Sequence, residues 1–187
     1  MAQGGTSTVA IIGAGIGGVY LVGHLGVAGH RVRLTHIDDA PLADIRARGG
    51  VDVEMPDGTR LAPVERATTK LAAATNGADV IIVVTGGNHQ AAVATSLAPL
   101  LRDGQLILLI QGNTGGSLIV RRALDAAGCA AEVDIAEMDN YPLSCWRLAP
   151  NPDQADHHQA CSADRGFSGP PRCRRVRAPV PPVSDRC

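Results

Sequence analysis

Short apolar runs alternate along the chain with longer segments in which apolar residues recur at helical spacing. The short runs predict strands at residues 9–12, 31–35, 79–85, 105–110 and 132–136. The longer segments predict helices after Gly18 and at residues 41–48, 69–75, 89–101 and 117–127. The run at 79–85 contains consecutive β-branched residues, which is typical of a strand buried on both faces. Strands and helices in this order predict an α/β protein with an open parallel sheet and right-handed crossovers.

One segment departs from this alternation. Residues 51–55 and 59–63 flank the turn tripeptide Pro56-Asp57-Gly58, in which proline presets φ and glycine suits a left-handed position. We therefore expect a hairpin arm at a place where a plain nucleotide-binding fold has a helix.

The first strand runs into a glycine-rich turn, Gly13-Ala14-Gly15-Ile16-Gly17-Gly18. Gly13 allows a sharp turn, Gly15 leaves no side chain to block a pyrophosphate, and Gly18 lets the helix lie close to the sheet. The helix N-terminus then presents N–H groups and a positive dipole end to the phosphates. The pattern predicts a Rossmann-type dinucleotide site with contacts from Gly13, Ala14, Gly15, Ile16 and Gly18. A glycine-rich turn that binds nothing is the alternative.

The end of the second strand normally decides between NAD and NADP. A carboxylate there binds both ribose hydroxyls of NAD. Asp38, 20 residues after Gly18, is one candidate, whereas His36, or a nearby Arg31 or Arg33, favours a 2′-phosphate. The two aspartates are open to two interpretations, a ribose contact by Asp38 or the capping by Asp39 of the helix that begins at Pro41. The expected cofactor is NAD or NADP, with a slight lean to NADP(H).

Further candidates follow the third and fourth parallel strands. His89 lies where ligands bind outside the carboxyl ends of such strands, although it also suits the first turn of a helix. Asn113 and Thr114 occupy a second glycine-rich loop, where they are candidates for cofactor or substrate contacts, and Thr114 is equally suited to cap the next helix.

Composition narrows the class of protein. The 187 residues are enough for one full domain, and the net charge of −1 gives no electrostatic basis for binding nucleic acid or an anionic membrane. No apolar run approaches the length of a membrane span, and the N-terminus lacks a signal-peptide pattern, so we expect a cytoplasmic protein. The five cysteines fit reduced thiols, and the spacing of His157, His158, Cys161 and Cys173 matches no known zinc pattern, so no metal site is expected.

Several motifs together resemble the amino-terminal domain of the octopine/nopaline (opine) dehydrogenases. They are the Gly13–Gly18 turn, the strand ADVIIVVT followed by His89, the run GNTGGSL at 112–118, and the stretch IAEMDNYPLSCWR at 135–147. The resemblance implies NAD(P)H-dependent reductive condensation of an amino acid with a 2-keto acid, or the reverse oxidation. It also implies that residues 137–141 lie near the domain junction. Ketopantoate reductases share the first third of the chain, but they carry a lysine after the strand that corresponds to residues 79–85, where Gly86 and Gly87 stand here.

The end of the chain departs from that family, whose helical second domain supplies the catalytic histidine. Residues 149–187 are rich in proline, arginine and cysteine and show no periodicity. We therefore expect a Rossmann domain at 1–148 and a disordered, possibly out-of-frame tail at 149–187, that is, a truncated enzyme with no identifiable catalytic residue. An exposed domain face would favour homodimers or other self-association. A non-catalytic NAD(P)-binding or regulatory module and a ketopantoate-reductase-like dehydrogenase are the alternatives.

Overall fold

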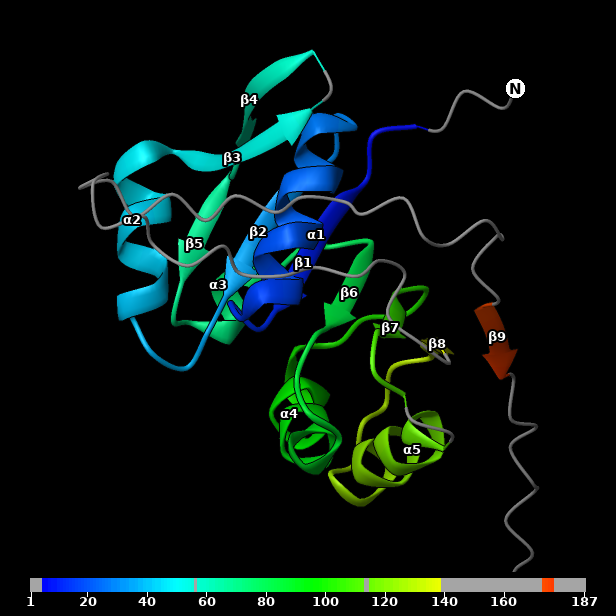
Figure 1. Cartoon of the computed structure of the whole chain (residues 1–187). Helices are drawn as coiled ribbons and strands as arrows, with labels where there is room; N and C mark the ends of the chain where they lie inside the picture. The colour runs from blue at the N-terminus through cyan, green and yellow to red at the C-terminus, as the bar shows by residue number, and fades with distance from the viewer. Residues whose placement is uncertain (1–4, 56, 113–114, 139–172, 177–187) are drawn as a thin grey trace, which may run out of the picture.

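A computed structural model describes residues 5–55, 57–112, 115–138 and 173–176 and contains one large, mostly parallel sheet (Figure 1). Its strands are β1 (Thr8–Ile12), β2 (Arg31–Thr35), β5 (Arg66–Thr68), β6 (Val80–Val83), β7 (Leu106–Leu109), β8 (Asp134–Met138) and β9 (Cys173–Val176). The strand order is β5-β2-β1-β6-β7-β8-β9, and every neighbouring pair is parallel except the antiparallel pair β8 and β9. The first six strands form a Rossmann-type doubly wound sheet.

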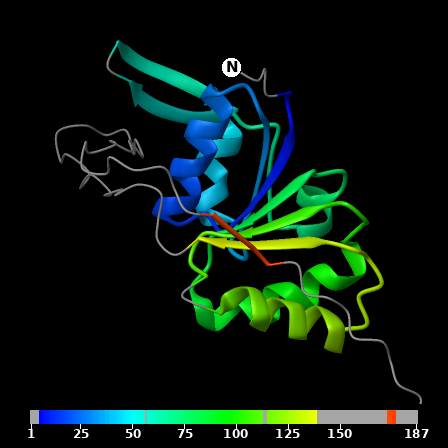
Figure 2. The ribbon, with the colours of Figure 1, turned by 90° about the vertical axis from the view of Figure 1, so that its right-hand side faces the viewer.

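Helices cover both faces of this sheet (Figure 2). The helices are α1 (Ile16–Val27), α2 (Ala40–Arg48), α3 (Leu71–Thr75), α4 (Gln90–Leu97) and α5 (Gly116–Ala126). Successive residues of β1 point to opposite faces: Val9 and Ile11 pack in the cluster with α1 and α2, whereas Ala10 and Ile12 pack in the cluster with α3, α4 and α5. In the described part of the chain, no helix is long and apolar enough to cross a membrane.

The predicted hairpin is present as β3 (Gly50–Met55) and β4 (Gly58–Pro63), which pair with each other and not with the large sheet. It packs on the second half of α1, where two glycines allow close approach. A Cβ on Gly23 would lie 2.6 Å from Val53 Cγ2, and a Cβ on Gly26 would lie 3.0 Å from Ala62 Cβ. The hairpin therefore lies at the end of α1 opposite to the glycine-rich turn (Figure 1).

The pattern-based strands and helices are confirmed, and two short strands were not predicted. β5 adds a parallel edge to β2, and β9 lies within the segment expected to have no regular structure. The segment predicted as one helix at 89–101 is divided into the 3₁₀ turn Gly87–His89, α4 and the 3₁₀ turn Ala98–Leu100, which contains Pro99. Apart from β9, residues 149–187 lie outside the described residues, so the disordered tail stays a prediction.

Candidate functional site

The strand order places the topological switch point of the sheet, where the winding direction of the chain reverses, between β1 and β6. From β1 the chain winds through α1 to β2 on one side, and from β6 it winds through α4 to β7 on the other. The loops that follow β1 and β6 therefore diverge at the carboxyl edge of the sheet. This is the position at which open α/β sheets bind their ligands.

Three of the four glycines in the glycine-rich turn after β1 show how the turn is packed. Gly13 has φ +117°, and a Cβ there would lie 2.6 Å from the Val84 carbonyl oxygen. A Cβ on Gly18 would lie 1.8 Å from the Gly13 carbonyl oxygen, whereas a Cβ on Gly15 would meet no atom of the described residues within 4 Å, its chain neighbours apart. Packing within the protein thus requires glycine at positions 13 and 18. It leaves the space above Gly15 open at the start of α1.

The start of α1 also lacks the groups that usually close a helix N-terminus. Gly15 occupies the N-cap and has no side chain to offer, and the first turn contains no acidic residue. Ala14 is buried, whereas the Ile16 side chain is partly exposed beside the turn. A positive helix end with no carboxylate in its first turn suits an external anion.

The loop after β6 contributes an unpaired hydroxyl beside this turn. Among the described residues Thr85 Oγ1 is buried without a hydrogen-bond partner, and the Thr85 Cγ2 would lie 3.7 Å from a Cβ placed on Gly13. His89 follows in the 3₁₀ turn, where its side chain is exposed and its Nε2 lies 3.1 Å from Asn88 Nδ2. His89 thus lies at the carboxyl edge of the sheet, at the surface of the loop that follows β6.

The second glycine-rich loop, between β7 and α5, differs from the first because a side chain of the protein binds it. Glu137 of β8 accepts hydrogen bonds from the N–H groups of Gly115 (3.2 Å) and Ser117 (2.8 Å). From the other side, Gln90 Nε2 donates to the Gln111 carbonyl oxygen at 2.6 Å, while Gln90 Oε1 is buried without a partner. The loop is therefore held between α4 and β8.

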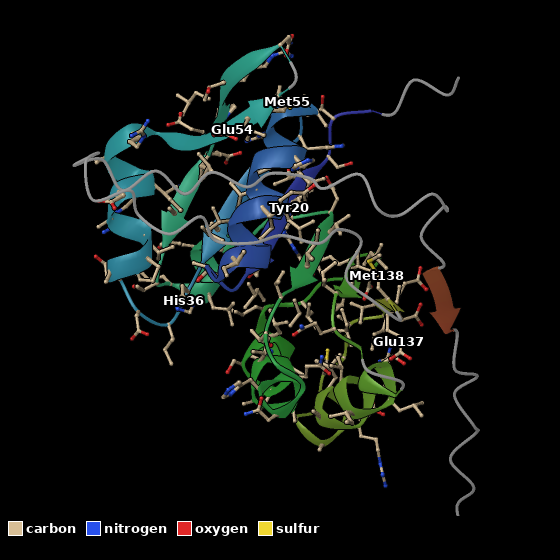
Figure 3. The ribbon with its side chains drawn as sticks, viewed as in Figure 1. Tyr20, His36, Glu54, Met55, Glu137 and Met138 are labelled. Carbon is tan, nitrogen blue, oxygen red and sulfur yellow. The ribbon has the colours of Figure 1, made fainter. Side chains whose placement is uncertain are left out.

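The alternative that Thr114 caps α5 stays a prediction, because Thr114 lies outside the described residues. The N-cap is Gly115, and the carboxylate that binds the start of the helix comes from Glu137. The predicted cofactor or substrate contacts of Asn113 and Thr114 also lie outside the described residues. Figure 3 shows Glu137 next to α5 and His36 next to the β2–α2 connection, with the start of α1 between them in this view.

The end of β2 carries the residues predicted to choose the cofactor. The His36 side chain is 29% exposed, and its Nε2 lies 3.9 Å from Asp38 Oδ2, whereas the Asp38 side chain is 74% exposed. Asp38 thus has an open carboxylate at the edge where a ribose would lie. Ile37, between them, is almost fully exposed.

The interpretation of Asp39 as a side-chain cap is wrong. It occupies the N-cap of α2 but makes no capping hydrogen bond. Its two oxygens instead accept hydrogen bonds of 2.6 Å each from Nη1 and Nη2 of Arg46. This hydrogen bonding holds the pKa of the Asp39 carboxyl below its usual value and raises the pKa of the Arg46 guanidinium.

Arg31 and Arg33, the arginines near the end of β2, are engaged in hydrogen bonds within the chain. Both donate to Glu65, each with an Nε–oxygen distance of 2.9 Å, and Arg33 also donates to the carbonyl oxygen of Asn76. Asn76 precedes β6, so the Arg33 guanidinium reaches toward the amino ends of the strands. Burial raises the pKa of Glu65, but the hydrogen bonds from both arginines outweigh it and keep that pKa below its usual value.

Sequence patterns missed four residues of this region: Thr85, Gln90, Arg46 and Glu137 as the anchor of a loop. Arg46 carries the one available signal, because it lies seven residues after Asp39 and so two turns along the same helical face. The hydrogen bonds of Gln90 and Glu137 join segments that are far apart in the sequence, so no local pattern predicts them. Among the described residues, no group of histidine, cysteine, aspartate and glutamate could hold a metal ion.

Comparison with known proteins gives a family and a fold. Residues 9–132 match the family model described as ketopantoate reductase PanE/ApbA. The chain is 34% identical over 140 residues to the opine dehydrogenase of Arthrobacter sp. (strain 1C), which covers 75% of this chain and 39% of that enzyme. Octopine dehydrogenase with NADH and L-arginine has a TM-score of 0.66 at 23% identity, covering 87% of this chain and 40% of that one. NADP⁺-bound yersinopine dehydrogenase has a TM-score of 0.65 at 17% identity, covering 84% and 39%.

These matches agree with the motifs and extend them. The resemblance to opine dehydrogenases is confirmed by the Arthrobacter relative, and the structural matches, both under 25% identical, confirm the Rossmann-type fold. The likeness to ketopantoate reductases reaches residue 132, well beyond the first third of the chain to which the motifs confined it. The chain spans 39% of the length of the opine dehydrogenase. It belongs to the ketopantoate reductase PanE/ApbA family.

Proposed function

We propose that this chain is the cofactor-binding part of an NAD(P)-dependent oxidoreductase of the opine dehydrogenase type. The observation that carries the proposal is the contrast within the β1–α1 turn. Gly13 and Gly18 are required by the protein's own packing, but no described residue beyond the chain neighbours comes within 4 Å of a Cβ placed on Gly15. A glycine there is explained by a ligand that approaches the backbone closely, as a pyrophosphate does.

The surroundings of the turn fit the same ligand. The start of α1 offers a positive helix end, and the Thr85 hydroxyl nearby has no hydrogen-bond partner among the described residues. The carboxylate of Asp38 is open at the end of β2, where the adenosine ribose would lie. The relatives support this assignment, because an octopine dehydrogenase binds NADH and a yersinopine dehydrogenase binds NADP⁺ on the same fold.

In the proposed reaction this domain binds the cofactor and orients its nicotinamide. A bound nicotinamide supplies or accepts a hydride. In the proposed reaction an amino-acid nitrogen bonds to the carbonyl carbon of a 2-keto acid, water leaves, and the resulting imine carbon accepts the hydride while its nitrogen gains a proton. The β1–α1 turn would fix the phosphates, and the loops after β6 and β7 would border the reacting end.

Direct titration tests the proposed cofactor site. NADH and NADPH are added to the purified full chain while nicotinamide fluorescence is followed, with ADP-ribose as a competitor that lacks the nicotinamide. We expect saturable binding that ADP-ribose reverses. A folded sample that binds neither nucleotide would overturn the proposal.

Two other functions remain candidates, each with its own supporting observation. A non-catalytic NAD(P)-binding module is supported by the side chains at the site. The carboxyls with a lowered pKa, Asp39 and Glu65, are paired with arginines, and the only described hydrogen bond of the His89 side chain is to its neighbour Asn88. A ketopantoate-reductase-like dehydrogenase is supported by the family match.

One assay separates these three functions. NADH or NADPH oxidation is measured with a 2-keto acid alone, with an amino acid alone and with both. Oxidation that requires both substrates supports the opine-type reaction, and oxidation with the keto acid alone supports a ketopantoate-reductase-like reaction. Cofactor binding without oxidation supports the module.

We also propose a cytoplasmic location and self-association. The half-buried free thiol of Cys129 suits a reducing compartment. Leu118 and Ile119 of α5 are 59% and 48% exposed, so this helix presents apolar surface beside the second loop. Light scattering at increasing protein concentration tests self-association, and replacing Leu118 with lysine should lower the average mass.

A further inference from the structure

An ion pair occupies the part of the proposed site where the two cofactors differ. Arg46 Nη1 and Nη2 each lie 2.6 Å from an oxygen of Asp39, in a two-pronged arrangement at the start of α2. Both side chains are at the surface, 41% and 60% exposed, so neither is fixed there by burial. Arg46 is thus accessible to solvent but has its guanidinium fork filled by a carboxylate of the same chain.

The neighbouring carboxylate is in a different state. Asp38 immediately precedes Asp39, is 74% exposed, and approaches the Nε2 of His36 only to 3.9 Å, beyond hydrogen-bond length. The two adjacent aspartates therefore differ: one is bound to an arginine and the other is open. An open carboxylate here accepts hydrogen bonds from ribose hydroxyls and repels a 2′-phosphate.

We propose that the Asp39–Arg46 ion pair sets the cofactor preference, so that the paired state favours NADH and the release of Arg46 admits NADPH. This inference rests on the proposed cofactor site. It differs from the slight preference for NADP(H) expected from the sequence, because Arg31 and Arg33, two candidates for binding the 2′-phosphate, donate hydrogen bonds to Glu65.

The physical reason is competition for one guanidinium. A planar guanidinium binds a phosphate through the same two N–H groups with which it binds a carboxylate. Asp39 lies at the N-cap of the helix that carries Arg46, so its carboxylate stays close to the guanidinium, and a 2′-phosphate must displace that carboxylate to bind. NADH has no such group and leaves the ion pair intact.

The test compares dissociation constants for NADH and NADPH, measured by nicotinamide fluorescence on the full chain. Asp39→Asn removes the competing charge and should tighten NADPH binding about tenfold, with NADH changed by less than about twofold. Asp44→Asn is the matched control, because Asp44 is exposed on the same helix, has no ion pair among the described contacts and loses the same charge. It should change neither constant by more than about twofold.

A double variant shows whether the gain acts through Arg46. Asp39→Asn combined with Arg46→Gln should lose the tightened NADPH binding, and the unaltered chain should bind NADH more tightly than NADPH. The inference is overturned if Asp39→Asn behaves like Asp44→Asn, if the double variant keeps the gain, or if the unaltered chain prefers NADPH. Binding of neither nucleotide by the unaltered chain would instead overturn the proposed cofactor site, and the inference with it.

Discussion

Two strand–loop–helix units of this sheet look alike in sequence and differ in how their helices begin. Both loops are rich in glycine, GAGIGG after β1 and GNTGGS after β7. At the second loop, the Glu137 carboxylate binds the N–H groups of Gly115 and Ser117 at the start of α5. At the first, Gly15 provides no cap, and no acidic residue lies in the first turn of α1.

The difference identifies which of the two helix ends is suited to a ligand. A helix N-terminus attracts a negative group whether that group belongs to the protein or to a ligand. At α5 the negative group is Glu137, so the loop is held shut against β8. At α1 the described residues provide none, and they leave the space above Gly15 open. In the first unit Gly13 and Gly18 therefore serve packing while Gly15 leaves access for a ligand, whereas the glycines of the second unit serve packing and loop geometry.

The largest expected effect separates the glycines of the first turn. Gly18→Ala places a methyl group 1.8 Å from the Gly13 carbonyl oxygen, and because backbone cannot yield easily it should cost about 3 kcal/mol or more of unfolding free energy. Gly15→Ala places it in open space and should change stability by less than about 1 kcal/mol. Urea denaturation measures both. Equal losses would mean that Gly15 is also required by packing.

Glu137→Ala should produce the next largest effect, a loss of about 2 kcal/mol, because two backbone N–H groups lose a charged acceptor. Glu137→Gln keeps the size of the side chain and one carbonyl acceptor, so it should retain part of that stability. Urea denaturation, with hydrogen exchange at Gly115 and Ser117, provides the measurement. Unchanged exchange in the alanine variant would show that the carboxylate does not hold the loop.

Sequence reasoning predicted the parts of this contrast that local patterns encode. β2 was predicted at its observed bounds, and the β3–β4 hairpin and the crossovers followed from turn residues and periodicity. The three-residue strand β5 was missed because Arg66-Ala67-Thr68 shows no apolar run and forms through backbone pairing with β2. β9 was missed for a similar reason, since it pairs with β8, far from it in sequence.

At the site, too, sequence reasoning missed the contacts between segments that are far apart in the chain. The turn glycines were found because their spacing is local. The anchoring of α5 by Glu137 joins residues 20 and 22 positions apart, and the Gln90–Gln111 hydrogen bond joins residues 21 apart. Asp39 was placed correctly at a helix start, but its pairing with Arg46 overrode the expected cap. Such choices between competing partners depend on tertiary geometry.

Thr85→Val should have a smaller effect of opposite sign. Removing a buried hydroxyl without a partner should stabilise the chain, in the absence of nucleotide, by about 1 kcal/mol. Thr75→Val is the matched control, because Thr75 Oγ1 donates to the Leu71 carbonyl oxygen at 3.0 Å, and its loss should destabilise by about 1 kcal/mol. Thermal unfolding compares the two. Destabilisation by Thr85→Val would mean that its hydroxyl has a partner within the protein.

The smallest effect concerns a carboxylate bound by side chains instead of backbone. Because the folded-state pKa of Glu65 lies below its ordinary value of 4.5, its contribution is fully present above that pH and is lost as pH falls through the lower folded value. Glu65→Gln should therefore cost less than about 1 kcal/mol at pH 7, and the difference should shrink below about pH 4.5. Urea denaturation at several pH values tests this; a difference that grows in acid would contradict the pairing with Arg31 and Arg33.

The central claim is that the space above Gly15 is the phosphate subsite of a dinucleotide. The most direct test is an NADH titration of Gly15→Ala beside the unaltered chain, after matched unfolding curves have shown that both are folded. A methyl group at this point should obstruct the close approach of the pyrophosphate and weaken binding at least about tenfold. Equal affinity in the two chains would show that the nucleotide, if bound, lies elsewhere, and would contradict the account.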